Sequence, residues 1–230
     1  MPTPGHPTAA AQPTDCERIL FIGAGGFGRE ALAWARDAWP ADAGRFAGFL
    51  SDDPLKLDGF CSDLRILGSL ASYVPSPADA LVLAIGIPGV RRRVAESLIA
   101  RGCRFLSLIH PTAIVAATAV IGAGSILCPY SIASDHARLG RFTLMNYHSS
   151  VAHDAATGDF AVLSPYATLG GGAGIGDDVF LGLHASVGPG VRIGDRSKVS
   201  ANSCALAHAG RESLIHGVPG RISPLISPES

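Results

Sequence analysis

Residues 115–145 read VAATAV IGAGSI LCPYSI ASDHAR LGRFTL M, and an apolar residue opens each group of six. The same spacing runs from Ile109 to Ala205 without an insertion. Of the 17 positions in this column, 14 are Val, Ile, Leu or Met. A second column, four residues later in each group, holds only Ala, Ser, Thr or Val from Ala113 to Ser203. Two columns six residues apart indicate a repeat, which must be sought before any other pattern.

Each hexapeptide of this repeat predicts one short strand followed by one turn. Three of them make a triangular coil of 18 residues, and the aliphatic column stacks inside at the spacing of neighbouring strands, about 4.8 Å. The small column fits where the interior is narrow. A helical or heptad period reproduces neither column. We therefore predict a parallel β-helix, or prism, over residues 109–206, with a little over five coils.

The chain before this repeat has another pattern. Apolar strands are predicted at residues 18–22, 46–50, 81–85 and 104–108, with helices from the glycines at 23–28 to about Trp39 and over residues 90–101. Strands that alternate with helices indicate a parallel sheet with Rossmann-like winding. We predict such a nucleotide-sugar-binding domain over residues 18–108.

The first predicted turn, GAGGFG at residues 23–28, brings backbone N–H groups to a helix N-terminus, where phosphate is favoured. Asp52 and Asp53 end the next strand, where a carboxylate commonly accepts hydrogen bonds from a ribose or a base. A dinucleotide-dependent dehydrogenase is rejected on size, since about 90 residues make one mononucleotide-binding half. The motif favours a nucleotide handle; a turn used only for strand–helix packing is the alternative.

The two parts together resemble the hexapeptide-repeat sugar acyltransferases of the sialic-acid O-acetyltransferase and nucleotide-4-amino-sugar N-acetyltransferase type, which include the perosamine enzymes. The resemblance covers residues 18–222. It is carried by IGAGGFGRE (22–30), LSDD (50–53), AIG (84–86) with Arg91, IHP (109–111), residues 146–154, GDF (158–160) and GVPGR (217–221). It implies a left-handed β-helix, a homotrimer with active sites between subunits, and acetyl transfer from acetyl-CoA to a nucleotide-linked amino sugar of the 4-amino-4,6-dideoxy type.

The resemblance also implies roles for single residues. The catalytic positions fall on His153 as general base, with Asp154 and Asn146. Substrate binding falls on the glycine turn and the following acidic pair: Gly25, Gly26, Phe27, Asp52 and Asp53. We assign acetyl-CoA binding to glycines beside the base and further along the prism: Gly170, Gly171, Gly172 and Gly182. No metal is expected.

The need for a base at His153 follows from the amine that accepts the acetyl group. An amine must lose a proton to attack a thioester, and neutral imidazole has a suitable pKa range. In an 18-residue coil, Asp135 lies below His153 and Gly171 above it. Asp154 alternates to the other side of a strand unless the backbone turns there, so both carboxylates stay candidates for orienting the ring, with Asp154 preferred. The backbone N–H near Gly171 is a candidate oxyanion donor.

Two positions depart from the family pattern. Ile87 and Pro88 follow Ala-Ile-Gly where a polar residue is frequent, and Val162 stands where a second His is frequent. The first change weakens the expected nucleotide contact. The second leaves open which acyl group the protein transfers.

Composition excludes several other classes. The net charge is −1 and charged residues make up 16%, which argues against nucleic acid or an anionic membrane as partner. No apolar run is long enough for a transmembrane helix. Five cysteines without a CxxC pair favour reduced thiols and a cytoplasmic location. Residues 1–17 are expected to form a disordered leader, and residues 207–230 a C-terminal loop and tail.

Three alternative functions stay open at this point. A base also serves sugar or sialic acid O-acetylation, and the prism alone would serve as a non-catalytic nucleotide-binding trimeric scaffold. A zinc-dependent prism enzyme would use three His ligands. His148 and His184 share a column two coils apart, but the third ligand position is Pro189. The sugar and its nucleotide are not determined by the sequence.

Overall fold

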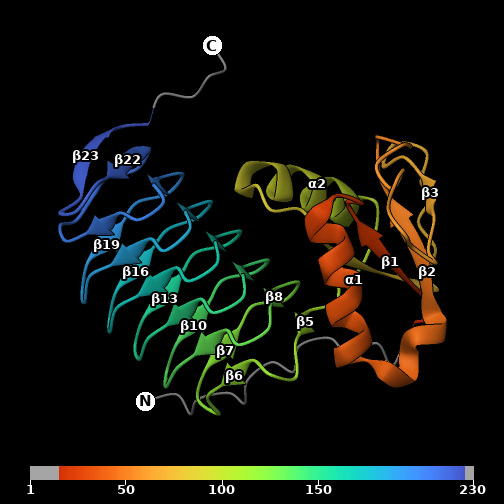
Figure 1. The fold of residues 1–230 in the computed structure, drawn as a ribbon, viewed down its shortest axis with the longest axis horizontal. Coiled ribbons are helices and arrows are strands. Elements are labelled where there is room, and N and C mark those ends of the chain that lie inside the picture. Colours follow the sequence, from red (N-terminus) through yellow and green to blue (C-terminus); the bar gives the residue numbers. More distant parts are fainter. Residues whose placement is uncertain (1–15, 226–230) are drawn as a thin grey trace.

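The computed structural model describes residues 16–225, so the predicted leader lies almost wholly outside the described residues. Figure 1 shows two parts side by side, a small sheet with its helices and a long stack of coils. The sheet has the order β3-β2-β1-β4 and every pairing in it is parallel. Its strands are β1 (Arg18–Ile22), β2 (Phe46–Leu50), β3 (Ile66–Gly68) and β4 (Asp79–Leu83).

Two helices pack against this sheet, α1 (Gly26–Ala38) and α2 (Pro88–Ala100), and a 3-10 helix η2 (Pro40–Arg45) follows α1. The predicted Rossmann-like winding is confirmed. The prediction of a strand at residues 104–108 is wrong. Phe105 makes only an isolated bridge to Leu81, because the chain then turns into the prism and Leu108 begins its first strand. The short strand β3 was not predicted.

The prism is a left-handed parallel β-helix, as predicted. Its three faces are stacks of two-residue strands, each paired in register with the strand 18 residues away. The first face contains β5 (Leu108–Ile109), β8 (Ile126–Leu127), β11 (Leu144–Met145), β14 (Val162–Leu163), β17 (Phe180–Leu181) and β20 (Lys198–Val199). The second contains β6 (Ile114–Val115), β9 (Ile132–Ala133), β12 (Ser150–Val151), β15 (Thr168–Leu169), β18 (Ser186–Val187) and β21 (Cys204–Ala205). The third contains β7 (Val120–Ile121), β10 (Arg138–Leu139), β13 (Ala156–Thr157), β16 (Gly174–Ile175) and β19 (Arg192–Ile193).

The two sequence columns form the prism interior. Leu127, Met145 and Leu163 are fully buried in the aliphatic column, and Ser131 and Ser149 are fully buried in the small column. The hydroxyl groups of both serines donate to backbone carbonyls of the preceding turn, so these buried polar groups are satisfied. The spacing of six residues therefore fixed the core.

The chain past residue 206 is more ordered than a loop. Strand β22 (Ser213–His216) stacks in parallel on β20, and β23 (Arg221–Pro224) pairs with it in antiparallel fashion. The prediction of a loop and tail is therefore wrong at β22 and β23, whereas most of the chain between the prism and these strands forms turns and loops. The hexapeptide column fails there, but the edge of β20 still offers unpaired backbone groups to a further strand.

The N-terminal domain sits on the first face of the prism, which we call the covered face. Outward-pointing Ile126, Leu144 and Val162 are at most 3% exposed and belong to one apolar cluster with Phe21 and Leu32. On the other faces the same outward position carries exposed or half-buried residues such as Arg138 and Ser150. Burial of these apolar side chains stabilises the contact between the two parts.

The prism has three corners, each a column of turns. The first corner contains residues 129–130, 147–148, 165–166, 183–184 and 201–202; the second contains residues 135–136, 153–154, 171–172 and 189–190. The third contains residues 123–124, 141–142, 159–160, 177–178, 195–196 and 211–212. Backbone hydrogen bonds link each turn to the next along its column, such as Asp154 N–H to the Asp135 carbonyl. None of the helices in residues 16–225 is long and apolar enough to cross a membrane.

Candidate active site

His153 and Asp154 form a hydrogen-bonded pair on the second corner. His153 Nδ1 lies 2.9 Å from Asp154 Oδ2, and both side chains are 68% exposed. The two side chains meet because Asp154 has a φ of 59°, so the backbone turns between them instead of alternating as a strand. A carboxylate beside Nδ1 favours the tautomer with the proton on Nδ1, which leaves the lone pair on Nε2.

Asp135, the other candidate partner of the imidazole, is engaged elsewhere. Its carboxylate accepts from the Thr118 hydroxyl at 2.5 Å and lies 3.0 Å from His136 Nδ1. These two hydrogen bonds lower the pKa of Asp135, and the one from the Thr118 hydroxyl has the larger effect. The geometry thus favours Asp154 as the residue that orients His153.

Gly171 lies directly above the imidazole. A Cβ atom on Gly171 would be 2.6 Å from both Cε1 and Nε2 of His153, so a side chain there would displace the ring. The Gly171 N–H makes no hydrogen bond with any residue that the structure describes. A free N–H beside the free nitrogen of a base is an arrangement that can hold a carbonyl oxygen while a proton is removed nearby.

The other glycines assigned to acetyl-CoA fall into two places. Gly170 and Gly172 flank Gly171 on the second corner. Gly182 begins a turn of the first corner, where a Cβ would lie 2.7 Å from the Ala201 nitrogen of the next coil. Close coil packing therefore also requires glycine at Gly182, and the residue does not lie beside His153 in the same chain.

Asn146 is also separated from His153. It begins a turn of the first corner, and its Oδ1 accepts the Tyr147 N–H at 2.8 Å. In one chain, the proposed base and this amide occupy different corners of a closed prism. They can face one site only if two chains contribute one corner each.

The first corner carries a stack of rings that the sequence reasoning missed. Tyr130, His148, Tyr166 and His184 are stacked, with ring centroids 4.6–5.1 Å apart and planes within 13°. All four have a φ between 54° and 62°. The spacing of 18 residues already placed His148, Tyr166 and His184 in one column. Among the described residues, no group of three or more His, Cys, Asp or Glu side chains is arranged to hold a metal.

The predicted nucleotide contacts lie at the carboxyl edge of the sheet. Gly25 precedes α1, whose N-terminus has no side-chain cap, and Gly26 is exposed. Phe27 is half-buried and packs against Trp34, with ring centroids 6.0 Å apart. Gly28 has a packing role, since a Cβ there would lie 2.0 Å from the Gly23 carbonyl oxygen. Uncapped N–H groups beside an accessible glycine can bind a phosphate.

Both acidic residues are exposed near this edge but already have partners. Asp52 Oδ1 accepts the Leu70 N–H at 2.9 Å. Asp53 Oδ1 accepts the Leu55 N–H at 3.1 Å, and its other oxygen lies 3.5 Å from Lys56 Nζ. Lys56 was missed by sequence reasoning. Its Cε lies 3.9 Å from the ideal Cβ position of Gly25, so a cation stands next to the glycine turn.

The two departures from the family pattern have structural explanations. Ile87 is the N-cap of α2 and is 64% exposed, and Pro88 occupies the first turn, where its missing N–H costs nothing. These two residues border a cleft of about 510 Å³ between α2 and the prism, with Phe180 and Lys198 opposite them. Val162 is buried on the covered face, under the N-terminal domain.

Comparison with known proteins agrees with this fold. Residues 18–98 match the model of the PglD N-terminal domain family. The structure of PerB from Caulobacter crescentus in complex with CoA and GDP-perosamine is 26% identical, with a TM-score of 0.80 over 90% of this chain and 97% of that one. The acetyltransferase domain of PglB from Neisseria gonorrhoeae is 25% identical, with a TM-score of 0.79 over 89% and 98%. The same domain in complex with acetyl coenzyme A has a TM-score of 0.78 at 25% identity, over 90% and 98%. No curated protein matches the sequence.

Proposed function

We propose that this chain, which is similar in fold and sequence to PerB and to the acetyltransferase domain of PglB, transfers acetyl from acetyl-CoA to the amino group of a nucleotide-linked amino sugar. The observation that carries the mechanism is the His153–Asp154 pair with Gly171 above it. PerB binds CoA and GDP-perosamine in its solved structure, which supports an amino sugar of the 4-amino-4,6-dideoxy type as acceptor.

His153 acts as the general base in this proposal. Nε2 removes a proton from the sugar amine as its nitrogen attacks the thioester carbonyl, and the Asp154 carboxylate stabilises the imidazolium that forms. The C–S bond then breaks, and the coenzyme leaves as a thiolate that takes up a proton. The Gly171 N–H donates to the carbonyl oxygen as it gains negative charge, and Gly170–Gly172 leave room for the pantetheine arm.

The assembly that completes this site is a homotrimer. The N-terminal domain packs against the covered face and the third corner, and Tyr147 of the first corner also contacts its apolar cluster, whereas the second corner contributes no residue to these clusters. In this proposal, three copies pack around a three-fold axis with the first corner of each copy against the second corner of the next. That contact would bring Asn146 and Gly182 of one copy to His153 of its neighbour.

The nucleotide is held by the N-terminal domain in this proposal. The uncapped start of α1 at Gly25–Phe27, with Lys56 beside it, is a site for the phosphates. Asp52 and Asp53 retain free lone pairs for a ribose or a base, since a carboxylate accepts several hydrogen bonds. Binding energy from this handle would be used to orient the distant amine, which is how remote contacts raise turnover.

The decisive experiment supplies acetyl-CoA with a panel of nucleotide 4-amino sugars, the matching hydroxyl sugars and free sialic acid, and follows release of free thiol. We expect turnover on the amino sugars. Turnover on hydroxyl acceptors alone would replace this proposal with O-acetylation. Binding without turnover on any acceptor would leave a nucleotide-binding scaffold.

A further inference from the structure

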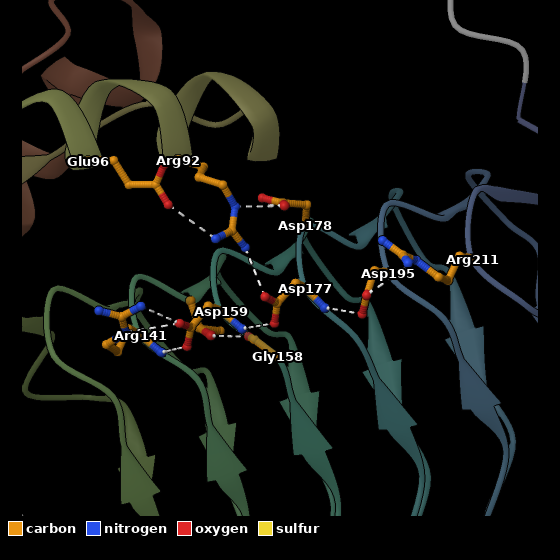
Figure 2. Close-up of polar contacts among 10 residues, drawn as sticks. Arg92, Glu96, Arg141, Gly158, Asp159, Asp177, Asp178, Asp195 and Arg211 are labelled. Atoms are coloured by element: carbon orange, nitrogen blue, oxygen red, sulfur yellow. Dashed lines mark hydrogen bonds and ion pairs between the residues drawn. The ribbon is translucent and has the colours of Figure 1, made fainter.

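The first turn of α2 carries two adjacent arginines that both reach the third corner of the prism. Arg92 Nε lies 2.7 Å from Asp178 Oδ2, and one of its terminal nitrogens lies 3.1 Å from Asp177 Oδ2, as Figure 2 shows. Its guanidinium carbon is also 4.4 Å from the centre of the Phe160 ring. Three positions on two coils of the prism therefore hold one arginine of the helix.

Arg91 points into the protein and makes a different set of contacts. It is 0% exposed, and one terminal nitrogen donates to the carbonyls of Leu83 at 2.9 Å and Ile85 at 2.5 Å. The other terminal nitrogen donates to the Phe142 carbonyl at 3.0 Å. Leu83 ends β4 and Ile85 follows it, whereas Phe142 belongs to the third corner. One guanidinium thus joins α2, the carboxyl edge of the sheet and the prism.

The charge of Arg91 has no carboxylate partner among the described residues, and its Nε has no hydrogen-bond partner. Burial lowers its pKa to about 9, so the group is still charged near neutral pH. Taking an ion out of water carries a large cost in free energy even after relaxation. A burial of this kind is costly unless the hydrogen bonds that it makes are needed.

Simple packing does not account for this choice. The surroundings are apolar, with Phe142 stacked on Phe160 at 4.9 Å and edge-on to Phe105 at 5.1 Å. A methionine has a similar length and would bury itself there without an ionic cost. What a methionine cannot do is donate in three directions from a rigid planar fork. The arginine is therefore explained by the carbonyls it connects.

These carbonyls lie at a functionally important place. Ile85 is next to the Gly23 turn, because a Cβ on Gly23 would lie 3.4 Å from the Ile85 side chain and 2.8 Å from the Ala84 carbonyl oxygen. The proposed nucleotide handle and the proposed base lie on different parts of the chain, the sheet and the prism, and the sugar must span from one to the other. A displacement of about 1 Å in such a span can lower turnover about 100-fold.

We infer that Arg91, assisted by Arg92, is a positioning residue that fixes the nucleotide-binding edge of the sheet relative to the prism, so that a nucleotide-linked acceptor reaches the thioester in register. This inference rests on the proposed function. It assigns Arg91 no contact with substrate or coenzyme. Its distinctive consequence is that the residue affects only acceptors that use the nucleotide handle.

The test compares Arg91→Lys and Arg91→Met with the control Arg93→Lys. Arg93 is on the same helix, is exposed and makes no hydrogen bond or ion pair with the described residues of the prism. For each variant, kcat/KM is measured with a nucleotide-linked amino sugar and with the same sugar free of nucleotide. We expect the advantage of the nucleotide-linked acceptor to fall at least 10-fold in both Arg91 variants. The free sugar, the KM for acetyl-CoA and the Arg93 control should be unchanged.

Two outcomes would overturn the inference. If the ratio of kcat/KM values for the two acceptors were unchanged in a folded Arg91→Lys variant, the contact would not control how the nucleotide-linked sugar reaches the thioester. An equal loss for both acceptors would show a merely structural role. Hydrogen exchange separates this inference from the proposed function: Arg91→Lys should expose the N–H groups of residues 83–87 while the prism stays protected. If wild-type protein transfers no acetyl group, the proposed function fails, and this exchange pattern still decides whether Arg91 holds the two parts together.

Discussion

The turns of the second and third corners have the same backbone conformation, with a positive φ at the second residue. The N–H groups of these turns nevertheless have different partners. On the third corner, the N–H groups of Arg141, Asp159 and Asp177 each donate to an aspartate carboxylate one coil further on, at 2.7–3.1 Å, as Figure 2 shows. On the second corner, the residue one coil further on from Gly171 is Pro189, whose side chain offers no acceptor. The Gly171 N–H consequently has no partner among the described residues.

This difference distinguishes the third corner, which holds the two parts of the chain together, from the second corner, which carries the candidate active site. Carboxylates that accept backbone N–H groups close the third corner, and one of these turns, Asp177–Asp178, also holds Arg92 of the N-terminal domain. A corner that lacks such side chains leaves donors and space for a ligand. The same repeat therefore serves two purposes, and single residues at its turns decide between them.

The largest effect is expected from His153→Ala. Loss of the base should lower kcat by roughly 10²–10⁴-fold while the assembly stays intact. The measurement is thiol release with the amino-sugar acceptor, together with the molecular mass in solution. His136→Ala, on the same corner and one coil lower, is the control and should retain activity. Unchanged turnover in the His153 variant would remove the second corner from the mechanism.

Gly171→Ala adds a side chain at the position above His153, where the wild type has none. The new Cβ would lie 2.6 Å from the imidazole and would displace it from the Gly171 N–H. We expect kcat to fall roughly 100-fold, the size of effect seen when one oxyanion donor is lost. Pro189→Ala, in the next coil of this corner, tests whether any change there is harmful. Wild-type turnover in Gly171→Ala would argue against the close contact of ring and glycine.

Substitution of Asp154 and of Asp135, one at a time, shows which carboxylate orients the His153 imidazole. Asp154→Asn replaces the carboxylate 2.9 Å from His153 Nδ1 by a neutral amide, which no longer stabilises the imidazolium, and should lower kcat about 10-fold or more. Asp135→Asn should leave kcat within about twofold, because that carboxylate bonds to Thr118 and His136. The comparison is a kcat measurement at saturating acetyl-CoA. A larger loss in Asp135→Asn would reverse the assignment.

Asp159→Ala should affect stability and leave chemistry unchanged. It leaves the Arg141 N–H without its acceptor and removes the ion pair at 2.8 Å, so unfolding should become easier by about 1–3 kcal/mol. Thermal unfolding measures this loss, and kcat at a temperature well below the transition should equal that of the wild type. A drop in kcat without a drop in Tm would mean that the third corner also takes part in the reaction.

The sequence by itself determined the prism, because its two columns repeat every six residues and every inward position is a local choice. It also identified the pair His153–Asp154 and the start of the sheet, where β1 and β2 have the predicted bounds. The sequence did not determine the end of the N-terminal domain, because the pairing of Phe105 depends on where the prism begins.

Only the tertiary structure decided which residues meet. It separated Asn146 from His153 by placing them on different corners, and it stacked four rings that are 18 residues apart in the chain. It also buried Arg91 between two parts that no local pattern connects. A repeat fixes contacts between neighbouring coils, because these recur at a constant separation. Contacts between the sheet and the prism have no constant separation, and packing of whole surfaces determines them.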